Sequence, residues 1–195
     1  ITVYVFINGV QSYTSTLTGS LVQSSTVRIG AEAGDTTAFN GIMSNFRMVK
    51  GQALYTGSFT PSTSPLTISS VGSTGAGAAS SITGTVGLLT CQDSTFKDNS
   101  TNAFTITPAT TTVKPLAVSP FTPSSYSNTA ITTYGSGYFD GTGDYLTIPA
   151  TPAMALGSGD FTIEAWIYTP STVAQFGAII CNANNPDGFY LSFST

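Results

Sequence analysis

Histidine is absent from the 195 residues of this chain, and charged side chains are scarce, at 7% of the sequence. Without histidine, Ser-His-Asp and Cys-His nucleophile systems in their usual form and His-ligated zinc are excluded. The five basic residues are scattered and make no patch that could neutralise several phosphates, so we expect no nucleic-acid binding. No run of about eighteen apolar residues occurs, which predicts no transmembrane helix and no membrane insertion.

Only two cysteines are present, Cys91 and Cys181, without the CxxC spacing of metal or redox motifs. Each lies in an apolar run typical of a strand, and we predict buried thiols there, with one disulfide as the alternative. Serine, threonine, glycine and asparagine fill most polar positions, a composition common in extracellular β proteins and viral appendages. We therefore expect an extracellular or virion-surface location. Ile1 lies inside an apolar stretch, and we expect the chain to be a piece of a longer polypeptide.

Apolar and polar residues alternate with a period of two along much of the chain, which predicts β-strands. Two such runs flank Asn8-Gly9, a pair that tolerates the positive φ angles of a type I′ turn, so we predict a hairpin there. The strand from Phe161 to Tyr168 divides into two faces. Its apolar face carries Phe161, Ile163, Ala165 and Ile167, and its other face carries Thr162, Glu164, Trp166 and Tyr168. The second face is a candidate for a partly covered concave surface.

Many short strands separated by turn signals follow residue 85, which predicts a β-sandwich. Before them, residues 67–84 consist mainly of serine, threonine, glycine and alanine. This stretch has little apolar area to offset the entropy of ordering it. We predict that it is a flexible linker or an extended connection.

The segments 137–149 (GYFDGTGDYLTIP) and 159–168 (GDFTIEAWIY) resemble, in order and spacing, the N-terminal half of LamG-like, concanavalin A-like jelly-roll domains. Residues 86–91 and 98–106 resemble the first strands of the same family. The resemblance implies an all-β fold, an antiparallel jelly-roll β-sandwich. It also permits a calcium ion at the rim of the sandwich.

The opening of the chain resembles the other end of that family. The matching segments are 5–11, 27–30, 39–51 and 54–61. We therefore predict that residues 1–66 are the C-terminal half of one LamG-like sandwich, 67–84 a linker, and 85–195 the N-terminal half of the next. In one arrangement the chain contains the end of one repeat and the beginning of the next in a tandem array. In the other, the two halves fold on each other, or on neighbouring copies, as a permuted sandwich.

Each half alone would leave strand edges unpaired and a core half covered, so we expect adjacent LamG-like repeats or neighbouring copies as partners. The sequences of segments such as YTGSFTPST and KDNSTNAFTIT resemble repeats of large virion structural proteins of marine phages, including tail fibres.

Glycoside hydrolysis is the enzymatic alternative, because concanavalin-like scaffolds also serve glycosidases. Those enzymes use two carboxylates roughly 5 to 9 Å apart, which on one strand face means acids two or four residues apart. Glu164 is the only acid in its strand, so we assign no catalytic residue and predict a hydrogen-bonded structural role for it.

Acidic turn residues supply the candidate metal ligands. Asp140, Asp144 and Asp160, with Asp187 and Asn184 elsewhere, carry the hard oxygens that calcium prefers. Ordinary turn formation explains the same Asp-Gly pairs, and no calcium-loop spacing is present. We therefore expect no required cofactor, with Ca²⁺ permitted.

A sugar site combines an aromatic platform with amide hydrogen-bonding groups, because a pyranose has an apolar face and a rim of hydroxyls. Candidates for such a set are Trp166, Tyr168, Tyr190, Asn182 and Asn184. Strand aromatics also serve as cross-strand packing, which is the competing interpretation. We predict a structural module of a repetitive virion appendage or surface fibre, with contact to cell-surface glycans as an added role. A lectin-like adhesion domain is the alternative.

Overall fold

A computed structural model describes residues 1–21, 26–32, 34, 37–121, 135–170, 177–182 and 189–193. Twelve strands and one short 3₁₀ helix lie in these ranges. They are β1 (Thr2–Ile7), β2 (Val10–Thr16), β3 (Val27–Ile29), β4 (Asn40–Lys50), β5 (Thr85–Thr90), β6 (Thr107–Pro108), β7 (Lys114–Leu116), β8 (Ser136–Asp140), β9 (Leu146–Ile148), η1 (Pro152–Met154), β10 (Phe161–Tyr168), β11 (Gly177–Cys181) and β12 (Tyr190–Phe193). No helix in this part of the chain is long and apolar enough to cross a membrane.

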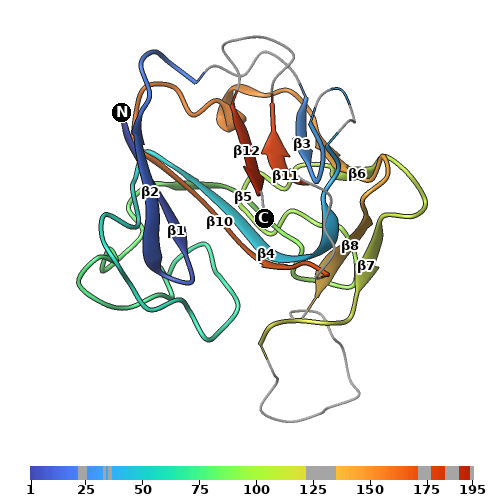
Figure 1. Cartoon of the computed structure of the whole chain (residues 1–195), viewed down its shortest axis with the longest axis horizontal. Coiled ribbons are helices and arrows are strands. Elements are labelled where there is room, and N and C mark those ends of the chain that lie inside the picture. The colour runs from blue at the N-terminus through green and yellow to red at the C-terminus, as the bar shows by residue number, and fades with distance from the viewer. Residues whose placement is uncertain are drawn as a thin grey trace.

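The long strand β4 organises the first sheet, whose order is β10-β4-β8-β7. Strand β10 runs antiparallel along one edge of β4, and the two cross the molecule together in Figure 1. The opposite edge of β4 is shared, because β8 pairs with its first residues and β5 with its last. With 11 residues, β4 is long enough to hold both neighbours.

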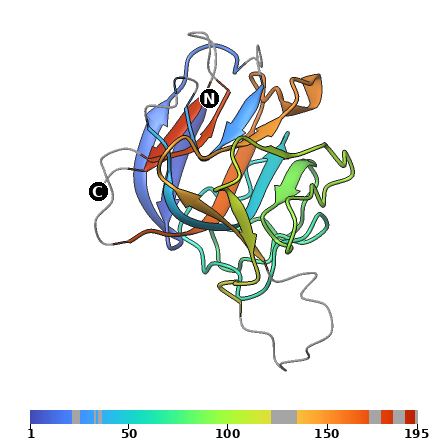
Figure 2. The ribbon, with the colours of Figure 1, turned by 90° about the vertical axis from the view of Figure 1, so that its right-hand side faces the viewer.

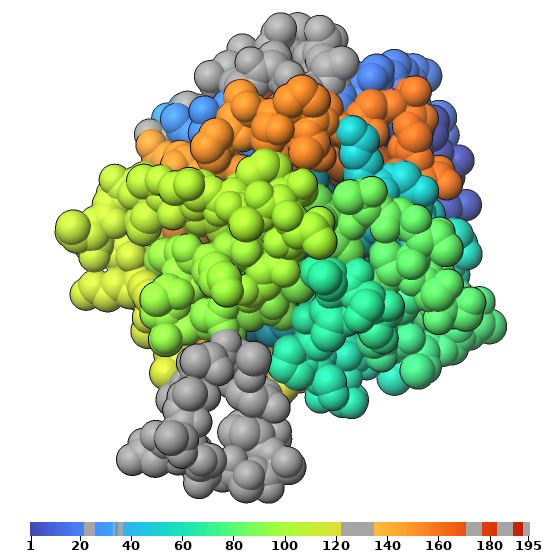
Figure 3. Space-filling view, turned by 180° about the vertical axis from the view of Figure 1, so that it is seen from behind, coloured from blue at the N-terminus to red at the C-terminus, as the bar shows by residue number. Residues whose placement is uncertain are grey.

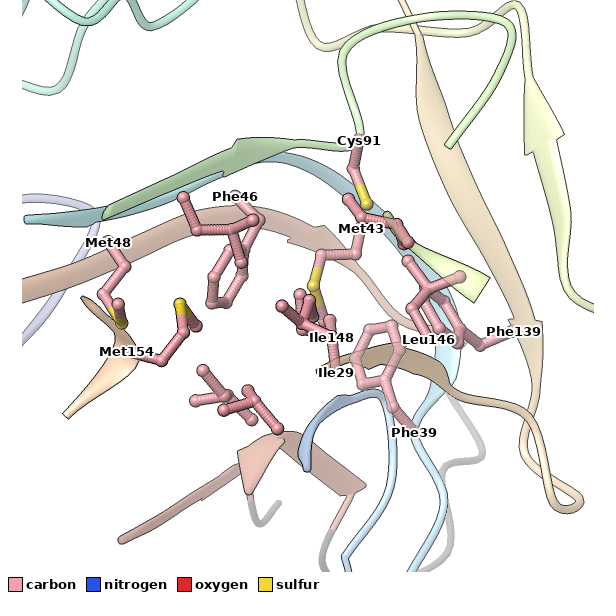
Figure 4. Close-up of a cluster of buried hydrophobic side chains, with 14 of the residues drawn as sticks. Ile29, Phe39, Met43, Phe46, Met48, Cys91, Phe139, Leu146, Ile148 and Met154 are labelled. Carbon is pink, nitrogen blue, oxygen red and sulfur yellow. The ribbon is translucent and has the colours of Figure 1, made fainter. Parts of the chain in front are cut away.

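The second sheet has the order β12-β11-β3-β9-β6 and lies across the main core from the first. Aromatic, methionine and branched aliphatic side chains from both sheets converge between them, as Figure 4 shows. All the pairs among the named strands are antiparallel. The chain is therefore all-β with antiparallel sheets, consistent with a β-sandwich. The finer jelly-roll connectivity stays a prediction.

Strands from both ends of the sequence share these sheets. The first 66 residues contribute β4 to one sheet and β3 to the other, and every strand that pairs with them comes from residues 85–193. Figure 2 shows the early strands, in blue and cyan, lying among the later ones. The two ranges therefore pair within one chain, while the boundaries that we predict for sandwich halves stay a prediction.

The two faces predicted for β10 are confirmed. Phe161, Ile163 and Ala165 pack against the main core. Trp166 packs on the opposite side of the sheet, against a second apolar cluster. Ile167, the last residue of the apolar face, is 37% exposed.

The predicted hairpin is also confirmed. Strands β1 and β2 form a separate two-stranded sheet, and Ile7 pairs with Val10 across the turn. Both turn residues have positive φ, 52° at Asn8 and 78° at Gly9. Gly9 is required for a second reason, since a Cβ there would lie 2.0 Å from the carbonyl oxygen of Phe59. The turn docks at this point, where the Phe59 N–H donates to the Gly9 carbonyl at 2.9 Å.

The segment 67–84, predicted as a linker, lies against the outer face of the first sheet. Val71 is buried there, and Ala78, Ala79 and Ile82 pack against the second apolar cluster. That cluster consists of Val49, Leu54, Tyr55, Leu66, Val71, Val86 and Leu89. From behind, the teal and green part of the chain covers the lower right of the molecule (Figure 3). From Met43 to Val49, strand β4 is thus buried on both faces.

Candidate functional site

A buried ionic network lies beneath the 67–84 segment, centred on Arg47. Its side chain is completely buried, on the face of β4 that points away from the main core. The Nε atom donates to Glu164 Oε1 at 2.8 Å, and Nη2 lies 2.7 Å from the same oxygen. The remaining guanidinium hydrogens reach three carbonyls of the covering segment, those of Thr67, Ser70 and Val71, at 2.7 to 2.9 Å. One side chain therefore ties β4, β10 and the 67–71 backbone together.

Glu164 completes the network on the side of Tyr55. The Tyr55 hydroxyl donates to Glu164 Oε2 at 2.8 Å and also lies 3.0 Å from Ser73 Oγ. Burial raises the pKa of Glu164, while the Arg47 guanidinium and the Tyr55 hydroxyl oppose that rise. Burial and the nearby carboxylate raise the pKa of Tyr55, which keeps its hydroxyl protonated as a donor. Both carboxylate oxygens are engaged, as the predicted structural role requires.

Strand register places the two charges opposite each other. Arg47 and Glu164 are direct cross-strand partners, and the register shifts just beyond them, before Trp166 pairs with Ser44. The shift coincides with Asn45, whose φ is +52°. A bulge of this kind re-aims side chains on the bulged strand. The Asn45 carboxamide oxygen accepts from the Leu66 N–H and from Gln92 Nε2, which fixes the chain before the covering segment.

Of the candidate metal ligands, Asp140 ends β8 and Asp144 lies in the turn before β9. Hydrogen-bond donors occupy both oxygens of Asp144. Thr110 and Thr112 donate their hydroxyls to Oδ1, and the Asp140 N–H donates to Oδ2 at 2.8 Å. Burial alone would raise the pKa of Asp144, but these donors lower it overall. Asp140 accepts from the Thr142 N–H in the way of an ordinary turn. In the described ranges, no group of three or more His, Cys, Asp or Glu could hold a metal ion.

The candidate sugar-binding residues are divided between the two sheets. Trp166 and Tyr168 lie on β10, whereas Tyr190 begins β12 and Asn182 follows β11. Asn182 is buried, and its side-chain oxygen accepts from the Phe189 N–H at 2.7 Å. Asn184 lies outside the described residues. Trp166 packs edge-to-face on Phe121, with ring centroids 5.1 Å apart.

Tyr168 belongs to a different aromatic group, which sequence reasoning missed. It is 68% exposed, and it pairs with Ile42 on β4, which in turn pairs with Tyr138 on β8. Direct cross-strand partners lie on the same face of a sheet. Because Met43 and Phe139, the next residues along, are buried in the main core, this row lies on the outer face. Finding it required the strand order, which brings residues far apart in sequence side by side.

Polar residues flank this aromatic row on the same face. Lys114 on β7 pairs with Tyr138 and extends the row. Asn40 and Asp140 pair with each other two residues further along their strands. Tyr168 and Tyr138 are two strands apart, or about 10 Å given the usual strand spacing. The outer face thus combines two partly exposed tyrosines with an amide, a carboxylate and an ammonium group.

Both cysteines are buried thiols, as predicted. Burial raises the pKa of Cys91 to about 12, and its Sγ faces the main core in Figure 4. A thiol with so high a pKa is a poor nucleophile, because the thiolate is the reactive form.

Comparison with protein-family models, curated proteins and solved structures finds no match to this chain. The fold itself defines the class of protein as all-β with antiparallel sheets. The LamG-like resemblance remains a prediction from the sequence.

Proposed function

We propose that this chain is a structural module of an extracellular or virion-surface fibre. One observation carries the proposal: Arg47 and Tyr55 engage both oxygens of Glu164, the acid that the glycosidase alternative would need, and Arg47 also ties the covering segment to the sheet. The carboxylate has a cation on one oxygen and a phenol on the other, with an exposed side-chain fraction of only 13%. A carboxylate held in this way stabilises the fold and has little access to a substrate.

The test compares stability with turnover. Glu164→Gln keeps the shape of the side chain but removes its charge, which leaves the buried Arg47 without a counter-ion. We expect lower resistance to urea and no polysaccharide hydrolysis by either protein. Hydrolysis by the unmodified chain that disappears in Glu164→Gln would replace the structural proposal with the glycosidase alternative.

A second candidate function, glycan contact, is favoured by the outer-face row of Tyr168, Ile42 and Tyr138. Tyrosine faces suit the apolar side of a pyranose, and the flanking Asn40 and Asp140 suit its hydroxyls. This row replaces Trp166 as the best place to test recognition, because Trp166 packs against Phe121 and the second apolar cluster. Its removal would weaken the fold as well as any binding.

A glycan array tests this second function. We expect binding that falls at least tenfold in Tyr168→Ala and in Tyr138→Ala. Tyr4→Ala is the matched control, because Tyr4 is 39% exposed, the same as Tyr138, but lies on the separate hairpin sheet. Equal loss of binding in all three variants, or no binding across a broad array, would count against recognition by this row.

A further inference from the structure

Each strand of the β1–β2 hairpin has one edge without a paired strand in the described ranges, and β2 is the more exposed of the two strands. These two strands make up their sheet by themselves, and within the described ranges no third strand joins them. Figure 1 shows the hairpin, in dark blue, as an element separate from the two large sheets. Along β2 the residues are exposed or half-buried. Such an edge offers backbone N–H and C=O groups to any strand that can pair with it.

This edge lacks the charges and prolines that usually protect an exposed strand. Residues 1–27 contain no Asp, Glu, Lys or Arg, and β2 contains no proline. The one irregularity is a register shift that leaves Ser12 without a cross-strand partner. Beyond it the ladder is regular from Tyr13, opposite Val5, to Leu17, which exchanges two hydrogen bonds with Ile1 at 2.8 and 2.9 Å. The pairing surface is therefore the five-residue segment 13–17.

We propose that this segment pairs antiparallel with the same segment of a second copy, about a two-fold axis at Ser15. In that register Tyr13 lies opposite Leu17 of the second copy, Thr14 lies opposite Thr16, and Ser15 lies opposite itself. Apolar residues thus face apolar residues, and hydroxyls face hydroxyls. Pairs of these kinds stabilise antiparallel strands. The result is a continuous sheet of the order β1-β2-β2-β1.

The sequence of the segment favours a second copy over an unrelated partner. Identical strands meeting about a two-fold axis bring identical charges together, which is unfavourable for a charged edge. Here no charge exists to repel, and residues 13–17 are chemically symmetric about Ser15, with Thr14 and Thr16 on either side. A charged partner would find no complementary charge on this edge. The contact is small, so one pair of chains associates weakly, and repetition in a fibre would strengthen it.

The strand pairing rests on the proposed function for its place in a fibre, and it adds the identity of the partner, a second copy of this chain. Its physical basis is independent, because the hairpin shares no residue with the Arg47 network. A glycosidase result would remove the structural proposal and leave the strand pairing to be judged on its own experiments. Failure of the pairing would leave a fibre module that associates through other surfaces.

Cysteine cross-linking of the full chain tests the register. Opposed Cα atoms in antiparallel strands lie about 4.5 to 5.5 Å apart, within the range that a disulfide spans. Ser15→Cys is therefore expected to form a covalent dimer under mild oxidation. Ser12→Cys is the matched control: it lies in the same strand and is more exposed, but its two copies would be about 20 Å apart. The native thiols, Cys91 and Cys181, are buried and do not compete.

Charge substitutions test the pairing without covalent capture. Thr14→Lys with Thr16→Lys places lysine opposite lysine twice, and each like-charged pair weakens association up to about fivefold. We expect the dissociation constant from sedimentation to rise roughly 25-fold. Thr14→Lys with Thr16→Glu places lysine opposite glutamate twice and is expected to restore association. Thr14 and Thr16 are both exposed, and circular dichroism verifies that each variant folds.

Three results would overturn the proposal. The first is cross-linking of Ser12→Cys equal to that of Ser15→Cys, which indicates random collision. The second is equally weak association of the Lys/Lys and Lys/Glu variants, which indicates that residues 14 and 16 do not face each other. The third is a strictly monomeric unmodified chain at roughly millimolar concentration, where even a weak pair would be populated.

Discussion

Replacement of Arg47 by methionine is the sharpest test of how the outer face of the first sheet is held. Methionine keeps much of the apolar stem but removes all five N–H donors. Glu164 would then keep only the Tyr55 hydroxyl, and its charge would remain largely buried. Breaking a buried ion pair by removing one partner costs about 3 to 5 kcal/mol.

The lost hydrogen bonds to the covering segment add less to the free-energy cost than the broken ion pair does. Thr67 and Ser70 are exposed residues, so water can take the place of Arg47 at their carbonyls. Only Val71 is buried, and its carbonyl has no such replacement. We therefore expect Arg47→Met to lower the free energy of unfolding by about 4 kcal/mol. Against a total stability of about 5 to 15 kcal/mol for an ordinary domain, this loss is large.

The double variant Arg47→Met with Glu164→Leu separates the charge from the packing. It leaves no orphaned ion, and replacement of a buried pair by apolar residues is often nearly neutral. We expect it to be more stable than either single variant. Urea unfolding followed by the fluorescence of Trp166, the single tryptophan, gives the three values, and circular dichroism checks that unfolding is two-state. Additive losses, or a cost under about 1 kcal/mol for Arg47→Met, would refute the reasoning.

Three further outcomes are expected. The lowered pKa of Asp144 contributes stability that is present above the usual carboxyl pKa of about 3.9 and is lost as pH falls below it. Asp144→Asn should therefore be less stable than the unmodified chain at neutral pH, and the difference should shrink in acid unfolding curves. Gly9→Ala should cost at least about 1 kcal/mol in thermal unfolding, because it adds strain at positive φ and a clash with Phe59; Gly19→Ala, with open space around it, isolates the contribution of the clash. Cys91 should react with a thiol reagent at pH 8 only as the chain unfolds, and rapid labelling of the folded chain would contradict its burial.

Local signals in the sequence were sufficient for several features. The Asn8-Gly9 pair specified its hairpin because few other residue pairs adopt two successive positive φ angles easily. The two faces of β10 followed from the period of two alone. The structural role of Glu164 was indicated by the lack of a second acid in its strand, although its partners could not be named.

Partners across strands could not be found in this way. Arg47 and Glu164 are 117 residues apart, and nothing in either local pattern connects them. The row of Tyr168, Ile42 and Tyr138 likewise depends on β4 lying between β10 and β8. The 67–84 segment has few large side chains, yet the hydrogen bonds from Arg47 to its carbonyls hold it against the sheet. Composition does not encode a bond between a distant side chain and a backbone oxygen.

By itself, the sequence determined which residues alternate, where the chain turns and which chemistry it lacks, because these depend on neighbours within a few positions. The tertiary structure alone decided which strands are neighbours and which face of β4 the 67–84 segment covers. It also decided that Arg47, Glu164 and Tyr55 meet beneath that segment. Those outcomes depend on strand order and register, and a register is chosen by the burial of whole faces at once. The uncharged edge of β2 depends on both. The sequence shows that residues 1–27 carry no charged side chain, but only the structure shows that no described strand pairs with this edge.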